Sequence, residues 1–172
     1  MSGKTGLMAG RAMNVLILCT GNSARSILGE ALFAALGEGR VTAFSAGSNP
    51  KGQPHPEALA TLARHGHDIS GFRSKRWDEF EVPGAPVMDA VITVCDSAAS
   101  EPCPVWPGAP SRAHWGLPDP AHIDDPDTCR AAFEATYAAL DARVRHVLAS
   151  GAGPHDPKAL SAALKAAHEA CS

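Results

Sequence analysis

Apolar residues occur along the chain in two kinds of segment, short continuous runs and longer stretches with helical periodicity. The runs lie in Asn14–Leu18, Val41–Ser45 and Asp89–Val94, and Arg112–Trp115 is a short fourth segment with two polar residues. Their length and composition are typical of buried β-strands. Strands that alternate with helices indicate a parallel sheet covered on both faces, so the pattern predicts an α/β fold.

Helical periodicity follows the first, second and fourth of these runs. Ala24–Leu36 carries an apolar stripe, and Pro56 begins a second helix that ends at Gly66. A short helix is expected at Ser74–Phe80. The longest helix is expected at Thr128–Ala149. One face of it carries Cys129, Phe133, Thr136, Leu140, Val144, Val147 and Leu148.

The length of 172 residues fits one domain with a full core. We expect residues 1–12 to be a disordered leader, residues 13–150 to form the folded domain and residues 151–172 to form a tail. Asp156 as N-cap and Pro157 as first residue favour a helix in that tail.

Composition narrows the function classes. Hydrophobic residues make up 45% and charged residues 19%, which is ordinary for a globular protein. A net charge of −3 with scattered Lys and Arg argues against nucleic-acid binding, and no apolar run is long enough to cross a membrane. Five cysteines without a secretory segment favour a reducing cytoplasm and thiol chemistry. We therefore expect a cytoplasmic protein. We also expect it to be a monomer.

The turn after the first strand carries the most informative motif. Cys19 and Arg25 lie there with five residues between them, directly before a helix. Backbone N–H groups at a helix N-terminus favour a bound anion, and a guanidinium contacts two of its oxygens at once. The same positive field is expected to lower the pKa of Cys19 and make it a nucleophile. The predicted oxyanion-binding residues are Thr20, Gly21, Asn22, Ser23, Ala24, Arg25 and Ser26. The alternative is a structural cysteine buried at a strand end.

Two more cysteines and a carboxylate add to this picture. Cys95 ends the third strand and therefore shares a sheet edge with Cys19, whereas Cys103 follows in a polar stretch. A thiol at a strand end and another on a mobile loop suit thiol–disulfide exchange. The alternative interpretation is two unrelated, half-buried thiols. Their spacing does not fit a zinc site, so no metal is expected. Asp119 can protonate a leaving oxygen, although Asp119-Pro120 alone indicates only a turn.

Residues 13–149 resemble the arsenate reductases built on the low-molecular-weight tyrosine phosphatase fold. The motifs that carry the resemblance are Cys-Thr-Gly-Asn-Ser-Ala-Arg-Ser from Cys19, Phe-Ser-Ala-Gly-Ser from Phe44, Val-Cys-Asp-Ser-Ala-Ala from Val94, Cys-Pro from Cys103 and His-Trp-Gly-Leu-Pro-Asp-Pro-Ala from His114.

This resemblance implies a three-layer sandwich around a four-stranded parallel sheet. It implies Cys19 as nucleophile, Arg25 as oxyanion clamp and Asp119 as general acid. It also implies that Ser26 steadies the thiolate and that Asn22 braces the loop. The substrate would be arsenate, with phosphate or sulfate as mimics, and no cofactor is implied.

The resemblance also implies that Cys95 and Cys103 form a disulfide relay. They lie one residue further apart than in the three-cysteine members of the family. The order of the relay therefore stays open, as does the choice between thioredoxin and a glutathione–glutaredoxin system as external reductant.

Some relatives bind a potassium ion near the anion loop, and its ligands would fall on Asn22, Glu30 and Ser45. Lys75 stands where those relatives place an acidic ligand. Its ammonium is expected to replace the ion by pairing with Glu30, and the alternative is a solvated surface lysine.

Two other functions remain open at this stage. A phosphotyrosine phosphatase would carry aromatic residues after the Asp-Pro, and Pro120–Ile123 supplies none. A non-catalytic oxyanion-binding or redox-sensing module would not need Cys19, Arg25 and Asp119 together.

Overall fold

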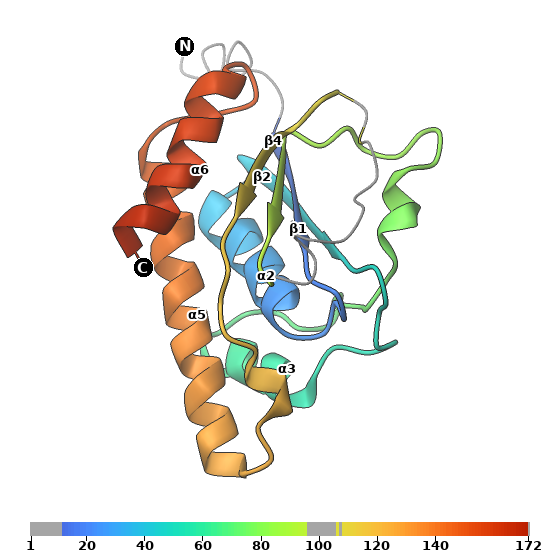
Figure 1. Cartoon of the computed structure of the whole chain (residues 1–172), viewed down its shortest axis with the longest axis vertical. Coiled ribbons are helices and arrows are strands. Elements are labelled where there is room, and N and C mark those ends of the chain that lie inside the picture. The colour runs from blue at the N-terminus through green and yellow to red at the C-terminus, as the bar shows by residue number, and fades with distance from the viewer. Residues whose placement is uncertain (1–11, 96–105, 107, 172) are drawn as a thin grey trace.

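The computed structural model describes residues 12–95, 106 and 108–171, so Cys103 lies outside the described residues. The strands pair only in parallel, in the order β2-β1-β3-β4 (Figure 1). This confirms the predicted four-stranded α/β architecture. The strands are β1 (Met13–Leu18), β2 (Val41–Ala46), β3 (Ala90–Thr93) and β4 (Ser111–His114).

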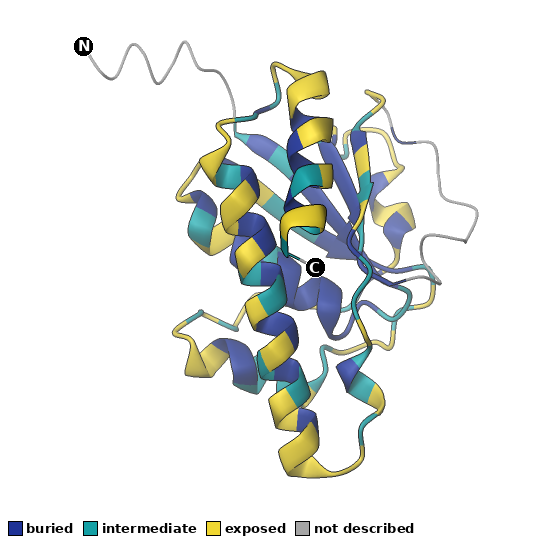
Figure 2. Cartoon of the chain, turned by 60° about the vertical axis from the view of Figure 1, so that its left-hand side comes forward, coloured by how far each residue is buried: buried dark blue, intermediate teal, exposed yellow. Residues whose placement is uncertain are grey.

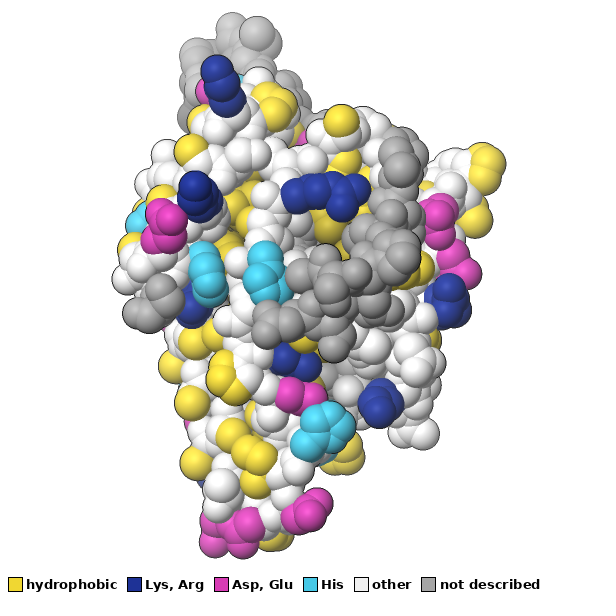
Figure 3. All heavy atoms as spheres, in the orientation of Figure 1, with side chains coloured by type: hydrophobic (Ala, Val, Ile, Leu, Met, Phe, Trp, Pro, Cys, Tyr) yellow, Lys and Arg dark blue, Asp and Glu magenta, His cyan; other side chains and the backbone are white. Residues whose placement is uncertain are grey.

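The helices lie close to their predicted positions. They are α2 (Arg25–Gly37), α3 (Pro56–Arg64), α5 (Pro126–Ala149) and α6 (Pro157–Cys171), with short 3₁₀ helices η1 (Trp77–Phe80) and η2 (Pro120–His122). None of these described helices is both long and apolar enough to span a membrane. On the face that Figure 3 shows, Lys and Arg side chains are spread out, with Asp, Glu and His side chains among them.

The two faces of the sheet bury different clusters. Along β1, Val15 and Ile17 point into the cluster that contains the inner faces of α2 and α5. Leu16 and Leu18 point to the opposite face, where Trp77 of η1 packs against them. The alternation follows from the two-residue period of a strand. In Figure 2 the buried residues of α5 form a stripe along the side that faces the sheet.

The short helix expected at Ser74–Phe80 is only partly present. Its first residues are extended, because backbone N–H of Gly47 donates to the carbonyl of Lys75 (2.9 Å) and that of Trp77 donates to the carbonyl of Gly47 (3.0 Å). Pairing with the end of β2 thus prevents helix formation before residue 77. The prediction was wrong there because periodicity does not reveal this contact between distant segments.

Helix α6 covers the edge strand β4 and packs against α5. The indole Nε1 of Trp115 donates to the carbonyl of Leu164 (2.9 Å), and the hydroxyl of Ser111 donates to that of Pro157 (3.0 Å). Covering an edge strand removes a row of open hydrogen-bonding groups from solvent. Helix α6 therefore belongs to the same folded unit as the sheet and protects its β4 edge.

The order of the strands decides where a ligand can bind. From β1 the chain crosses to β2 on one side, and it later returns to β3 on the other side. The loops that leave the ends of β1 and β3 therefore diverge and open a crevice at the sheet edge. Leu18 pairs with Thr93, so Cys19 and Cys95 lie at neighbouring strand ends.

Candidate active site

The loop between β1 and α2 is shaped to present its backbone N–H groups. Ala24, the N-cap of α2, makes no capping hydrogen bond with its side chain. Asn22 has a left-handed backbone conformation (φ 43°), which reverses the direction of the loop. The first N–H groups of α2 therefore have no capping side chain at the residue that precedes them, and this end of the helix favours an anion.

Asn22 lies fully buried beneath the loop. Its amide nitrogen donates to the hydroxyls of Ser26 (2.9 Å) and Ser45 (3.0 Å), and its amide oxygen accepts from the backbone N–H of Lys75 (2.8 Å). The side chain thus ties the loop to β2 and to the segment before η1. Among the described residues, the hydroxyl of Ser26 accepts from Asn22, and no hydrogen bond joins it to Cys19.

A buried lysine and glutamate lie behind Asn22. The Lys75 ammonium donates to the backbone carbonyls of Ser45 (2.8 Å) and Arg73 (2.9 Å), and the Glu30 carboxylate accepts from the Ser45 hydroxyl (2.5 Å). Burial raises the pKa of Glu30 and lowers the pKa of Lys75, and each charge acts against the shift of the other. The expected direct ion pair is absent among these residues, because Ser45 bridges the two groups. The expected surface-exposed alternative does not hold either, since Lys75 is buried.

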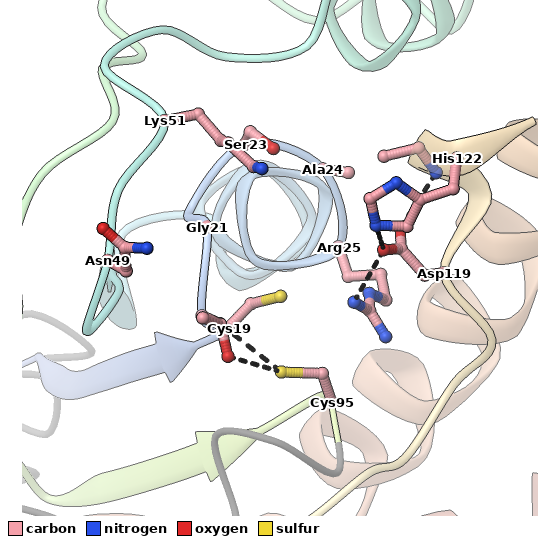
Figure 4. A pocket seen from close by; sticks show the side chains of 12 residues that line it. Cys19, Gly21, Ser23, Ala24, Arg25, Asn49, Lys51, Cys95, Asp119 and His122 are labelled. Atoms are coloured by element: carbon pink, nitrogen blue, oxygen red, sulfur yellow. Dashed lines mark hydrogen bonds and ion pairs between the residues drawn. The ribbon is translucent and has the colours of Figure 1, made fainter. Parts of the chain in front are cut away.

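A pocket of about 230 Å³ opens above the loop (Figure 4). Twelve residues line this pocket. Asn22 and Ser26, which the sequence predicts for the site, are not among them. Four lining residues were not predicted, namely Asn49, Lys51, Ala121 and His122. The others are Cys19, Thr20, Gly21, Ser23, Ala24, Arg25, Cys95 and Asp119.

The Arg25 guanidinium keeps a buried donor without a partner. One terminal nitrogen donates to the carbonyl of Leu117 (2.8 Å), and the other lies 3.5 Å from a carboxylate oxygen of Asp119. The Nε atom is buried without a hydrogen-bond partner. Because an unpaired buried donor is costly, the side chain is poised to bind an acceptor such as an oxyanion.

Asp119 is held at the start of η2. One oxygen of its carboxylate accepts from the backbone N–H of Ala121 (2.9 Å), and the other lies 2.9 Å from Nε2 of His122. The carboxylate therefore stands between an arginine inside the pocket and a histidine at its rim. This position suits a group that exchanges a proton with a bound ligand.

The two cysteines of the pocket interact with each other. The Cys95 sulfur accepts from the backbone N–H of Thr20 (3.4 Å) and lies 3.6 Å from its hydroxyl. Hydrogen bonding to Cys95 and burial raise the pKa of Cys19, whereas the charge of Arg25 and the N–H of Gly21 lower it. The pKa of Cys19 is therefore raised here, not lowered as the sequence predicted, because Cys95 and burial together outweigh the positive field.

Sequence reasoning missed Asn49 and Lys51 because they follow β2 in the stretch Gly-Ser-Asn-Pro-Lys, whose pattern indicates only a turn. A signal was present, since parallel strands all end at the same sheet edge and β2 adjoins β1. Gly47 allows the close approach of the two segments. A Cβ on this residue would lie 2.4 Å from the carbonyl oxygen of Thr20.

The chain belongs to the low molecular weight phosphotyrosine protein phosphatase family, whose model matches residues 14–162. Within this family, it is similar to proteins that are named arsenate reductases. One from Brevibacillus brevis is 32% identical over 137 residues, which cover 80% of this chain and 95% of the relative.

Two solved structures extend the comparison. An arsenate reductase in the phosphate binding state is 27% identical with a TM-score of 0.60, and the match covers 80% of this chain and 97% of the other. A thioredoxin-dependent arsenate reductase of Corynebacterium glutamicum is 26% identical with a TM-score of 0.60. That match covers 85% of this chain but 65% of the other.

Proposed function

We propose that this protein reduces arsenate to arsenite, with Cys19 as nucleophile and Cys95 as the second thiol. The observation that carries the proposal is that both residues line one small pocket, at the ends of neighbouring parallel strands. Hydrolysis of a phosphate ester needs only one of them. Reduction of arsenate needs two electrons, and two thiols supply these when they form a disulfide. The names of the similar proteins support the same reaction.

In the first step, the Cys19 thiolate attacks arsenic and an arsenic–oxygen bond breaks. The proton that Cys19 loses passes to an oxygen of the bound arsenate dianion. The loop N–H groups and the unpaired Nε of Arg25 hold the oxyanion. Asp119 donates a proton to the departing hydroxide, which leaves as water. The product is a covalent adduct between the Cys19 sulfur and pentavalent arsenic.

In the second step, Cys95 loses its proton to water, and its thiolate attacks the Cys19 sulfur. The sulfur–arsenic bond breaks with its electron pair on arsenic, which leaves as arsenite, and a Cys19–Cys95 disulfide forms. Cys103, which lies outside the described residues, then attacks Cys95 and releases Cys19 as a thiolate. An external dithiol reduces the Cys95–Cys103 disulfide and restores the enzyme. The name of the Corynebacterium glutamicum protein supports thioredoxin as that dithiol.

The reaction is tested with the reduced full chain and arsenate, with oxidation of the reductant as readout. One arm supplies thioredoxin and its reductase, and the other supplies glutathione and glutaredoxin. We expect arsenate-dependent oxidation in the thioredoxin arm. Turnover only with glutathione and glutaredoxin would replace the proposed reductant. Absence of oxidation in both arms, with steady hydrolysis of an aryl phosphate, would make the protein a phosphatase instead.

The relay is tested by a single turnover without reductant, followed by peptide mapping. We expect a Cys95–Cys103 disulfide in the parent chain and a Cys19–Cys95 disulfide in Cys103→Ser. Cys171→Ser is the matched control, because that cysteine lies at the end of α6 and does not line the pocket. Normal turnover of Cys103→Ser with glutathione and glutaredoxin would contradict the three-cysteine relay.

A further inference from the structure

The mouth of the pocket carries a lysine that the proposed reaction does not use. Lys51 lies in the segment after β2 and lines the pocket. In Figure 4 its side chain extends to a position beside Ser23, on the opposite side of the loop from His122. In the same view Cys19 lies at the opposite end of the loop from both residues, so a ligand held above Cys19 would present its outward side toward them.

The position of Lys51 is fixed by its contacts with the anion loop. Its backbone N–H donates to the carbonyl of Gly21 (2.9 Å), and that of Asn49 donates to the carbonyl of Thr20 (2.9 Å). The aliphatic part of Lys51 lies across Gly21, since a Cβ on that glycine would be 3.2 Å from Cγ of the lysine. The lysine therefore has an anchored backbone and a supported stem, which brings its ammonium to the pocket mouth.

The positive charge of the Lys51 ammonium is not paired with a carboxylate among the described residues. The side chain of Lys51 is exposed. Arg25, by contrast, lies 3.5 Å from the Asp119 carboxylate, which offsets part of its charge. Lys51 thus contributes positive charge to a pocket that is suited to a multiply charged anion.

We propose that Lys51 binds the outward oxygen of a free inorganic oxyanion and so selects arsenate or phosphate over phosphate esters. This inference rests on the proposed function, which places the ligand above Cys19. In-line attack by sulfur puts the leaving oxygen opposite Cys19, at the mouth of the pocket. In a free oxyanion that oxygen accepts from the ammonium. In an ester it carries an organic group, which weakens this contact and covers the charged lysine with apolar surface.

The proposal is tested by measuring ligand binding to the reduced full chain at constant ionic strength. The probes are inorganic phosphate and an aryl phosphonate, which resembles an ester but is not cleaved. Lys51→Gln removes the charge, and Lys51→Arg keeps it. Lys158→Gln is the matched control, because it removes one positive charge from α6 outside the pocket.

We expect Lys51→Gln to weaken phosphate binding by about tenfold, the scale of one charge-assisted hydrogen bond, and aryl phosphonate binding by less than about twofold. Lys51→Arg and Lys158→Gln should bind phosphate like the parent chain. Equal losses for both probes in Lys51→Gln, or no loss for phosphate, would overturn the proposal. Because these measurements need no turnover, a parent chain that binds phosphate but does not reduce arsenate would reject the proposed reaction alone.

Discussion

The Asp119 carboxylate lies 3.5 Å from the Arg25 guanidinium, at the side of the pocket opposite the segment that carries Lys51 (Figure 4). A bound oxyanion competes with this carboxylate for the same guanidinium. Protonation of Asp119 would weaken its attraction to the arginine, and the same proton is the one that a leaving hydroxide requires. The pair therefore couples oxyanion binding by Arg25 to protonation of the Asp119 carboxyl.

Asp119→Asn should separate binding from chemistry. The amide removes the competing negative charge, so phosphate should bind at least as tightly as to the parent chain. Formation of the Cys19–arsenic adduct should slow by about 10²–10⁴-fold, the usual range for a positioned proton donor. Equilibrium binding and rapid-mixing kinetics measure the two effects. Unchanged adduct formation would make Asp119 only the N-terminal residue of η2.

Cys19→Ser should abolish arsenate reduction while the protein stays folded. A hydroxyl at this position has no base to activate it and cannot form a disulfide. Circular dichroism and arsenate-dependent reductant oxidation are the measurements. Cys129→Ser is the control, since Cys129 is buried on α5 with its sulfur 3.6 Å from the carbonyl of Pro120. Substantial residual turnover in Cys19→Ser would end the proposed mechanism.

Gly47→Ala should disrupt the pocket. The added Cβ would lie 2.4 Å and 2.5 Å from the carbonyl oxygens of Thr20 and Cys19, and backbone atoms cannot move aside cheaply. We expect a loss of about 1–3 kcal/mol in the free energy of unfolding and weaker phosphate binding. Denaturant unfolding and calorimetry measure these quantities. Gly71→Ala, where a Cβ meets nothing within 4 Å, should change neither.

Reduction by the parent chain should not depend on added potassium. The buried Lys75 ammonium already supplies a cation beside Ser45 and the Glu30 carboxylate. Initial rates in potassium and in choline buffers of equal ionic strength should therefore agree. Lys75→Met leaves two backbone carbonyls without their donor and should cost about 1–3 kcal/mol of stability. A potassium requirement in the parent chain would contradict the role of the Lys75 ammonium in place of the ion.

Acid should weaken the docking of α6. Burial, and then the charges of Arg143 and His114, lower the pKa of His168, whose Nδ1 accepts from Nε of Arg143 (3.2 Å). The unfolded chain therefore takes up this proton at a higher pH than the folded protein does. Stability should fall as the pH decreases through the ordinary histidine pKa of about 6.5.

This pH effect is measured by denaturant unfolding at several pH values between about 5 and 8, within the range where histidine titrates. His168→Gln keeps an acceptor for Arg143 but cannot be protonated, so its stability should depend less on pH. His67, whose pKa is also lowered, contributes in the same direction in both proteins. An identical pH dependence of parent and variant would contradict the role of His168.

Local patterns in the sequence are enough to predict the elements and the anion-binding character of the loop. Continuous apolar runs such as β1 and the long apolar face of α5 depend on local periodicity, which a single sequence displays directly. The strand–loop–helix order around Cys19 and Arg25 likewise places an anion-binding turn without knowledge of the other strands. The position of Cys95 at the same sheet edge as Cys19 was also predicted, because all strands of a parallel sheet end at one edge.

The surroundings of that loop depend on contacts between segments far apart in the chain. The extended conformation before η1 depends on pairing with Gly47, and the raised pKa of Cys19 depends on the sulfur of Cys95. Lys51 and His122 reach the pocket because separate segments converge on one sheet edge. Contacts, burial and charge balance between residues far apart in the chain have no local pattern. They are therefore set by how the strands are ordered and packed, which periodicity does not encode.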